Sequence, residues 1–426
     1  SSHLAKGQVT PIMAKAVAKK PAGRHRALVK KKGKYAVEGV GPAGGAKTKI
    51  KVGFVCNKWH DPIPVGTQDR DYPEEHKCHN NLTSNPNANG WGGQFQVDVS
   101  MGLKVLRLHP DIFEVDFMKG SEVTPARIAS NHINFNMWYD CMCALNSGDK
   151  KHINEVIKAQ KAVNMWPTWE YANWIYHKIH YMKQLIKAGV PMIPTIFVED
   201  GFNPSSVLTK VQAKGWDKFF VKPAYMGMFG MGAIHGKTKD FIADPSLLEN
   251  FRKEAKDQKQ FLVQPYMIQP NGMVFDEVRH YFIDGTWSYA IFTDGTDEDN
   301  VYHEPEGERK EKTKVLALKA FQEVLKVTKW CGESIVPTFT RIDVGLYADK
   351  ANPKKVKKVF VNEVEMEMCT WLCRYCPFNL VDRMGPVYVK KARELLTGLL
   401  KAKKPLKDKA EMKKLLQVLE ERCGRL

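Results

Sequence analysis

Short apolar runs alternate with segments of helical spacing along most of the chain. The run Ile50–Cys56 (IKVGFVC) predicts a buried strand, and after a long polar loop at residues 57–93 the runs VLRLHP and FEVDFM predict two more. From Asn131 the pattern turns helical. Residues 171–188 have the apolar spacing of a single helix, which we expect Gly189 to end.

From Pro194 onward the pattern is dominated by short strands. In order they read TIFV, FFVKP, FLVQPYM, VRHYFID, WSYAIFT, FTRIDVGLY and KVFVNEVEM. Two helical stretches, Pro245–Asp257 and Lys314–Trp330, interrupt them. Strands interleaved with single helices predict an α/β and α+β protein in which an α/β domain comes first.

The first 48 residues have a different composition from the rest of the chain. They contain almost no large apolar side chains to offset the entropy of ordering, which predicts a flexible arm. Of the net charge of +18, residues 1–49 supply +11, since they hold twelve Lys or Arg and one acid, Glu38. This composition also suits an organellar transit peptide. A second basic stretch, Lys401–Lys414, is expected on the solvated face of a terminal helix.

Apolar run lengths and the cysteine count exclude the classes of membrane proteins and disulfide-rich proteins. No apolar run is long enough to cross a bilayer or to form a signal-peptide core, so we expect a soluble cytoplasmic protein, with organellar import as the alternative. The nine cysteines are an odd number in a large chain, which favours reduced thiols. Cys369, Cys373 and Cys376 have the spacing of an iron–sulfur motif, but only 50 residues follow the last, and we interpret them as buried or incidental thiols.

Several basic segments together suggest a site for a triphosphate. Lys222 lies on the strand FFVKP and offers a point charge to phosphate oxygens. Lys178, from a helix, and Arg279, from a later strand, would add charge from other directions. The loop after Lys222 has three glycines that let backbone amides approach the same oxygens closely, namely Gly227, Gly230 and Gly232.

Three carboxylates near the end of this series, Asp343, Glu363 and Glu365, form an all-oxygen set. Such hard ligands suit the Mg²⁺ that bridges ATP phosphates. Glu363 and Glu365 are two residues apart on a strand and share a face, as do Arg341 and Asp343. Asn362 should point to the opposite face, so we do not include it among the ligands.

The order of these segments resembles the ATP-grasp superfamily over about residues 165–380, with a weaker likeness to that family's preceding α/β domain over 49–164. GVPMIPT, FFVKP, LVQPYM, EVR, RID and NEVE take the places of the family's motifs in turn. Two departures stand out. The glycine-rich loop is unusually apolar, with Met226, Met228, Phe229 and Met231, and Glu365 stands where the family often has Asn.

The resemblance implies a role for each matching position. Arg341, Lys222 and Arg279 would be catalytic, with Arg341 stabilising negative charge in the reacting centre. Asp343, Glu363 and Glu365 would bind Mg²⁺. The residues that would bind ATP are Lys178, Lys222, Gly227, Gly230, Gly232, Gln264, Tyr266, Met267 and Arg279.

The implied reaction is an ATP- and magnesium-dependent ligation in which a small-molecule carboxylate, activated as an acyl phosphate, is attacked by an amine. Within the same fold, a small-molecule kinase and an amino-acid ligase that modifies acidic protein tails are alternatives. We do not expect a nucleic-acid binder or a membrane partner, and we leave a homo-oligomer open. The expected divisions are a basic tail at 1–48, a pre-ATP-grasp α/β domain at 49–195, an ATP-grasp domain at 196–385 and C-terminal basic helices at 386–426.

Overall fold

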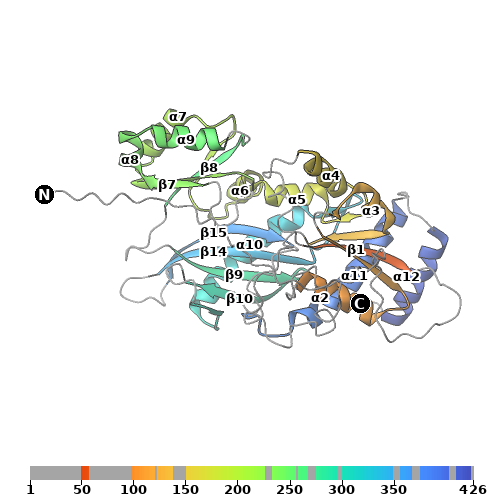
Figure 1. Cartoon of the computed structure of the whole chain (residues 1–426). Helices are drawn as coiled ribbons and strands as arrows, with labels where there is room; N and C mark the ends of the chain where they lie inside the picture. Colours follow the sequence, from red (N-terminus) through yellow and green to blue (C-terminus); the bar gives the residue numbers. More distant parts are fainter. Residues whose placement is uncertain are drawn as a thin grey trace, which may run out of the picture. The chain divides into compact units, whose positions relative to one another are not determined.

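The structure is a computed structural model of the chain (Figure 1). It describes residues 49–56, 97–119, 122–137, 150–225, 233–255, 258–266, 275–294, 300–348, 356–366, 375–402 and 409–423. All of them belong to one unit, Gly44–Leu426. Among the helices described, none combines the length and apolar character needed to span a bilayer.

A four-stranded parallel sheet with the order β2-β1-β3-β4 opens the described chain. Its strands are β1 (Ile50–Cys56), β2 (Phe113–Lys119), β3 (Ile133–Asn136) and β4 (Met165–Trp166). The helices that connect them are α2 (Val97–Leu108), α3 (Pro125–Ser130) and α4 (Lys150–Gln160). Parallel strands joined by helices confirm the α/β class predicted for this part of the chain.

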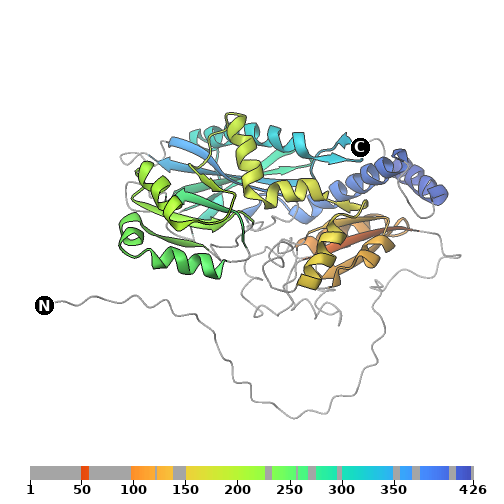
Figure 2. The same ribbon diagram turned by 90° about the horizontal axis from the view of Figure 1, so that it is seen from above.

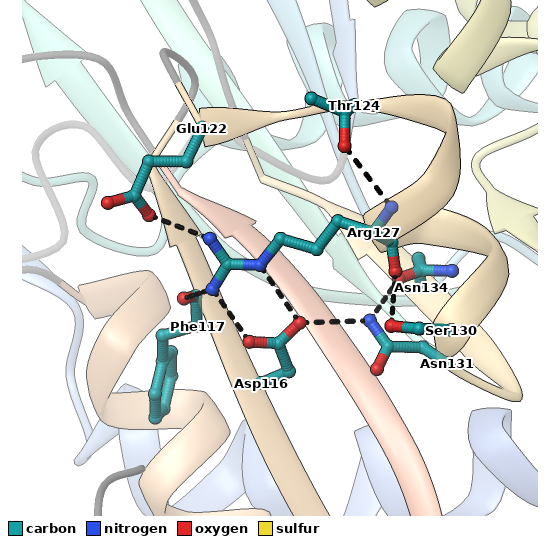
Figure 3. A network of polar contacts seen from close by, with 8 residues as sticks. All are labelled: Asp116, Phe117, Glu122, Thr124, Arg127, Ser130, Asn131 and Asn134. Carbon is teal, nitrogen blue, oxygen red and sulfur yellow. Dashed lines mark hydrogen bonds and ion pairs between the residues drawn. The ribbon is translucent and has the colours of Figure 1, made fainter. Parts of the chain in front are cut away.

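A polar network fixes α3 against this sheet (Figure 3). The Arg127 guanidinium donates to both carboxylate oxygens of Asp116 on β2, at 2.7 and 3.2 Å. Asn131 donates to Asp116 at 3.2 Å and to the buried Asn134 at 2.8 Å. Gly53 on β1 leaves room for both amides, because a Cβ there would lie 2.0 Å from Asn134 Oδ1.

A five-stranded antiparallel sheet with the order β11-β10-β9-β14-β15 forms the centre of the chain. The long helix α10 (Glu308–Val327) covers one face, where Phe321 stacks on Phe282 of β9 with ring centroids 4.2 Å apart. The opposite face carries the charged residues described below. The strands are β9 (Asp276–Ile283), β10 (Thr286–Thr293), β11 (Val301–His303), β14 (Phe339–Ala348) and β15 (Val356–Met366).

A smaller antiparallel sheet has the order β5-β8-β6-β7. On β6 the side chains alternate, so that Phe219 and Val221 enter a core with the helices while Lys222 points to the other face. Figure 2 shows this sheet and its helices in green, grouped apart from the orange elements of the parallel sheet. The elements are β5 (Ile196–Val198), α7 (Pro204–Ala213), β6 (Lys218–Pro223), β7 (Ile234–Lys237), α8 (Thr238–Ala243), α9 (Ser246–Glu254) and β8 (Phe261–Pro265).

The remaining elements join these sheets. Helix α11 (Leu380–Lys401) places Tyr388 against Phe54 and Phe135 of the parallel sheet, with centroids 5.4 and 4.9 Å apart. Its Lys390 forms an ion pair of 2.6 Å with Asp284, in the turn between β9 and β10. The others are α5 (Trp169–Tyr176), α6 (Lys178–Lys187), the two-stranded ribbon of β12 (Lys329–Trp330) and β13 (Glu333–Ser334), and α12 (Lys409–Cys423).

Three predictions for the first part of the chain were wrong. VLRLHP is not a strand but the end of α2, whose buried Met101 and Val105 lie one helical turn apart. The chain does not turn helical at Asn131, because β3 follows almost at once. The single helix expected over 171–188 is two helices, α5 and α6, interrupted at His177, whose φ of −90° and ψ of 86° are not helical.

Later boundaries also differ from the prediction. The basic stretch Lys401–Lys414 does not lie in one helix, since α11 ends at Lys401 and α12 begins at Lys409. Helix α10 begins at Glu308, six residues before the expected Lys314. The proposed division between residues 385 and 386 falls inside α11, which runs through it without a break. Gly189 does end α6, with a φ of 69° that favours glycine.

Candidate active site

Three neighbouring strands carry a row of charged side chains across the central sheet. The strand register pairs Asp343 of β14 with Arg279 of β9 on one side and with Glu363 of β15 on the other. Two residues earlier on β14, Arg341 is paired with Glu365. Since side chains alternate along a strand, all five lie on the face that α10 does not cover. The fold thus brings together residues predicted separately from three segments.

Arg341 and Asp343 form the most complete ion pair of this row. The guanidinium donates from Nε and Nη2 to the two carboxylate oxygens of Asp343, at 2.7 and 2.9 Å. Both side chains are almost fully buried, and Glu365 Oε1 lies 4.0 Å from the same guanidinium. Two parallel bonds fix the plane of the guanidinium, so one edge of Arg341 is held in place.

Lys178, the first residue of α6, reaches the same row from outside the sheet. It forms an ion pair with Glu363, and only 9% of the lysine side chain is exposed. Burial lowers the pKa of Lys178, but the charges of Glu363, Tyr181 and Glu365 together outweigh this and raise it above its ordinary value. For Glu363, burial raises the pKa, while Lys178 and Lys222 together hold it at about 2. The pair is therefore ionised throughout the neutral range.

Lys222 contributes a second, half-buried cation from β6. Burial and the charge of Lys178 together lower its pKa to about 7. Glu365 shows the opposite behaviour, because burial and the charge of Glu363 raise its pKa to about 7. Two lysines held this close favour an anionic ligand, whose charge would offset their mutual repulsion.

Glu277 and Asn362 belong to the same face and were not among the predicted site residues. Glu277 accepts from Arg279 Nη2 at 2.8 Å and from Asn362 Nδ2 at 2.7 Å. Burial, with the charge of Asp343, raises the pKa of Glu277. The position of Glu277, two residues before Arg279 on one strand, was the signal in the sequence that could have identified it.

The prediction that Asn362 faces away from the site was wrong. The pairing of β14 with β15 shifts between Asp343 and Val344, which are paired with Glu363 and Val361. Asn362 is the extra residue of this β-bulge. A bulge interrupts the alternation of faces, which brings the Asn362 amide to Glu277.

The carboxylates of this face are neutralised by cations rather than grouped around a common point. In the described part of the chain, no three His, Cys, Asp or Glu side chains are arranged to hold a metal ion. Asp343 is instead paired with Arg341, and Glu363 with Lys178. The donor atoms are nevertheless the hard oxygens that Mg²⁺ prefers, so the residues fit this metal by chemistry.

The residues predicted to border the nucleotide lie on the small sheet. Gln264 of β8 is buried and donates to Thr195 Oγ1 at 2.8 Å. The ring of Tyr266 has Lys218 Nζ 3.7 Å from its centroid and His235 beside it at 5.5 Å. The remaining predicted residues lie outside the described ranges, namely Gly227, Gly230, Gly232 and Met267, with the loop residues Met226, Met228, Phe229 and Met231.

Of the three cysteines with iron–sulfur spacing, only Cys376 lies within the described residues. It is buried, and burial raises the pKa of its thiol to about 12. A neutral, buried thiol is what we expected at this position. Cys369 and Cys373 lie outside the described ranges.

Comparison with known proteins identifies the fold. No protein-family model matches the chain, and no curated protein matches it. Among solved structures, the chain is similar to the D-cycloserine synthetase DcsG, with a TM-score of 0.54, 15% identity, and coverage of 80% of this chain and 99% of that one. It is also similar to D-alanyl-alanine synthetase A from Vibrio cholerae, with a TM-score of 0.50, 16% identity, and coverage of 83% and 100%.

Both similarities extend over nearly the whole length of the solved proteins. The order of these parts agrees with the order of the motifs FFVKP, LVQPYM, RID and NEVE in the sequence. The chain therefore has the ATP-grasp fold.

Proposed function

We propose that this protein is an ATP- and magnesium-dependent ligase that activates a carboxylate as an acyl phosphate and joins it to an amine. The observation that carries the proposal is the charged row on β9, β14 and β15, which the buried Lys178 approaches from α6 and the half-buried Lys222 from β6. The names of the two similar proteins support the reaction class. D-Alanyl-alanine, the product named for one of them, is an amide of a carboxylate and an amine.

The cations would act on the phosphates of ATP. Phosphoryl transfer demands that the reactants be positioned and that the charge spread over the phosphoryl oxygens be stabilised. Lys178 and Lys222 supply positive charge from two directions, and Arg279 lies beside Asp343 with its Nη1 3.8 Å from Oδ2. Charges held in place by packing need little reorganisation as the reaction proceeds.

The reaction would proceed in two balanced steps. A carboxylate oxygen of the substrate attacks the γ-phosphorus of ATP, the bond to the β-phosphate oxygen breaks, and ADP leaves. The amine nitrogen then attacks the carbonyl carbon, the carbon–oxygen bond to the phosphoryl group breaks, and phosphate leaves while the nitrogen loses a proton. We assign Arg341 to the negative charge that develops on the carbonyl oxygen at the second step, because Asp343 fixes the guanidinium in position.

We propose Asp343, Glu363 and Glu365 as the residues that hold magnesium. The metal would supply positive charge to the phosphate oxygens of ATP. In the structure Glu363 is paired with Lys178 through Oε1, and this pair would compete with the metal for the carboxylate. The ATP phosphates offer Lys178 an alternative partner, so nucleotide binding and release of Glu363 would occur together.

The test is ADP release by the purified protein, screened with MgATP and pairs of amino acids or small carboxylic acids. We expect at least one pair to stimulate ADP release, and Asp343→Asn to abolish the stimulation while remaining folded. Hydroxylamine added with the carboxylate alone should trap the acyl phosphate as a hydroxamate. A phosphorylated alcohol in place of a hydroxamate would show a kinase, and no stimulation by any pair would contradict the ligase proposal.

A further inference from the structure

The break between α5 and α6 is built around His177, immediately before Lys178. The backbone of His177 forms an isolated antiparallel bridge with Tyr225, just beyond β6. The Lys178 amide donates to the Ala224 carbonyl at 2.9 Å, and the Ala224 amide donates to the Gln260 carbonyl, also at 2.9 Å. Three segments that are far apart in sequence are thus held together at the residue that precedes Lys178.

The His177 ring strengthens this junction. It is 3% exposed, and its Nε2 donates to the side-chain oxygen of Gln260. One face of the ring stacks on His180 with centroids 4.1 Å apart, and the Tyr225 ring meets it nearly at right angles, 4.5 Å away. Tyr225 is held from α5 as well, because its hydroxyl donates to Asn173 Oδ1 at 2.9 Å.

Packing alone does not account for a histidine at this position. The second ring nitrogen of His177, Nδ1, is buried and has no hydrogen-bond partner among the described residues. Burying an unsatisfied polar atom costs free energy that an apolar ring of similar size would not incur. The bond from Nε2 to Gln260 is therefore the feature that distinguishes His177 from an apolar residue.

The contact of His177 with Tyr225 connects the two segments that carry the lysines assigned to the phosphates. Lys178 follows His177 directly, and Lys222 is three residues before Tyr225 on the segment that His177 holds. The two lysines are close enough for the charge of Lys178 to lower the pKa of Lys222. A change at the junction would therefore alter the spacing of two charges that have to meet one triphosphate.

We propose that His177 is a positioning residue that sets the spacing between Lys178 and Lys222 through its bond to Gln260 and its bridge to Tyr225. The inference rests on the proposed function, because it assumes that both lysines bind the phosphates of ATP. It predicts that His177 affects the binding of the phosphates and leaves the binding of the adenosine part unchanged.

Calorimetric titration of wild-type protein and variants with MgATP and with adenosine tests the proposal. His177→Leu keeps the bulk and removes the donor, and should weaken MgATP binding about tenfold, the effect of one lost hydrogen bond. Adenosine affinity should stay within about twofold. His177→Gln restores a donor and should recover most of the loss, while His180→Leu, which keeps the bond to Gln260, should bind MgATP like the wild type.

Each other outcome overturns the proposal. Equal losses for MgATP and adenosine, or unchanged MgATP affinity in folded His177→Leu, would show a merely structural role. If His177→Leu does not fold, Gln260→Met removes the same bond from the other side, and unchanged MgATP affinity there has the same meaning. A wild-type protein that does not bind MgATP contradicts the proposed function itself, whereas wild-type binding with unaffected variants contradicts only the role of His177.

Discussion

Replacing Lys178 with methionine should give the protein an affinity for divalent metal in the absence of nucleotide. In the structure Lys178 forms an ion pair with Glu363, which is one of three carboxylates proposed to hold magnesium. Methionine has a similar length and no charge, so Glu363 would lose its strongest partner. With 24% of its side chain exposed, Glu363 is accessible enough to accept a metal ion in place of the lysine.

In Lys178→Met the metal no longer has to displace the bond between Lys178 and Glu363. The free energy of that bond therefore sets the size of the gain in metal affinity. A hydrogen bond between charged groups stabilises a protein by about 1.5 to 3 kcal/mol. Because about 1.4 kcal/mol corresponds to a tenfold change in an equilibrium constant, the dissociation constant for metal should fall about 10- to 100-fold. The same substitution leaves Glu363 without its counter-charge, so we also expect a loss of stability, roughly 1 to 3 kcal/mol after allowing for its partial exposure.

Mn²⁺ is a suitable probe because it shares the preference of Mg²⁺ for carboxylate oxygens, and free Mn²⁺ can be measured by electron paramagnetic resonance. The matched control is Lys183→Met, since Lys183 is on the same helix and paired with Glu199, but 47% of its side chain is exposed. Lys178→Arg retains the charge and should resemble the wild type. Folded Lys178→Met protein that binds Mn²⁺ no more tightly than the wild type, or an equal gain in Lys183→Met, would refute the reasoning.

Three other substitutions have defined outcomes. Burial and the charge of Glu363 raise the pKa of Glu365 to about 7, above its ordinary value of 4.5, so the wild type loses stability as pH rises from about 4.5 to 7. Glu365→Gln removes this loss. Urea unfolding should therefore show that the free energy of unfolding rises by about 1 to 3 kcal/mol at pH 8 and changes little at pH 4.5. Equal effects at the two pH values would contradict the assignment. Gly53→Ala should cost about 3 kcal/mol in the same assay, because its Cβ would collide with Asn134, and a cost below about 1 kcal/mol would show that the network adapts. In Arg341→Lys the lysine cannot make the two parallel bonds to Asp343. We therefore expect kcat to fall about 100-fold with little change in KM for ATP. A rise in KM without a fall in kcat would place Arg341 in nucleotide binding.

The strands of the second half of the chain could be predicted because their local pattern agrees with their environment. On β6 every second residue enters the core of the small sheet, so the alternation in FFVKP is visible in the sequence. The same alternation placed Arg341 with Asp343, and Glu363 with Glu365, on one face. The register that puts these two pairs beside each other is a tertiary feature that the alternation does not specify.

The errors arose where distant contacts outweigh local preference. Residues 171–188 have helical spacing throughout, yet the helix breaks at His177 because its backbone pairs with Tyr225. Asn362 is turned toward the site by a β-bulge, which an alternating pattern gives no reason to expect. The run VLRLHP begins with the β-branched Val105 and is short enough to be a strand, and the burial of Met101 and Val105 on one helical face became apparent only in the structure.

The substrate could not be predicted for a different reason. The segments from which specificity would arise are residues 57–93, the aromatic segments of 131–181 and the loop of 293–312, and none contains a motif that identifies a substrate. The first lies outside the described residues, and much of the aromatic segment is core, with Tyr171, Tyr176 and Tyr181 fully buried. Buried aromatic residues report on packing and carry no information about the carboxylate or the amine.

Direct titration with MgATP tests the central claim, that the charged face, Lys178 and Lys222 form a nucleotide site, without any knowledge of the substrate. We predict that the wild-type protein binds MgATP with a dissociation constant between about 1 μM and 1 mM, the range in which most enzymes bind their substrates. Lys222→Ala should weaken binding at least about tenfold while the variant remains folded. No binding of MgATP by the wild type, or equal affinity in Lys222→Ala, would contradict the account.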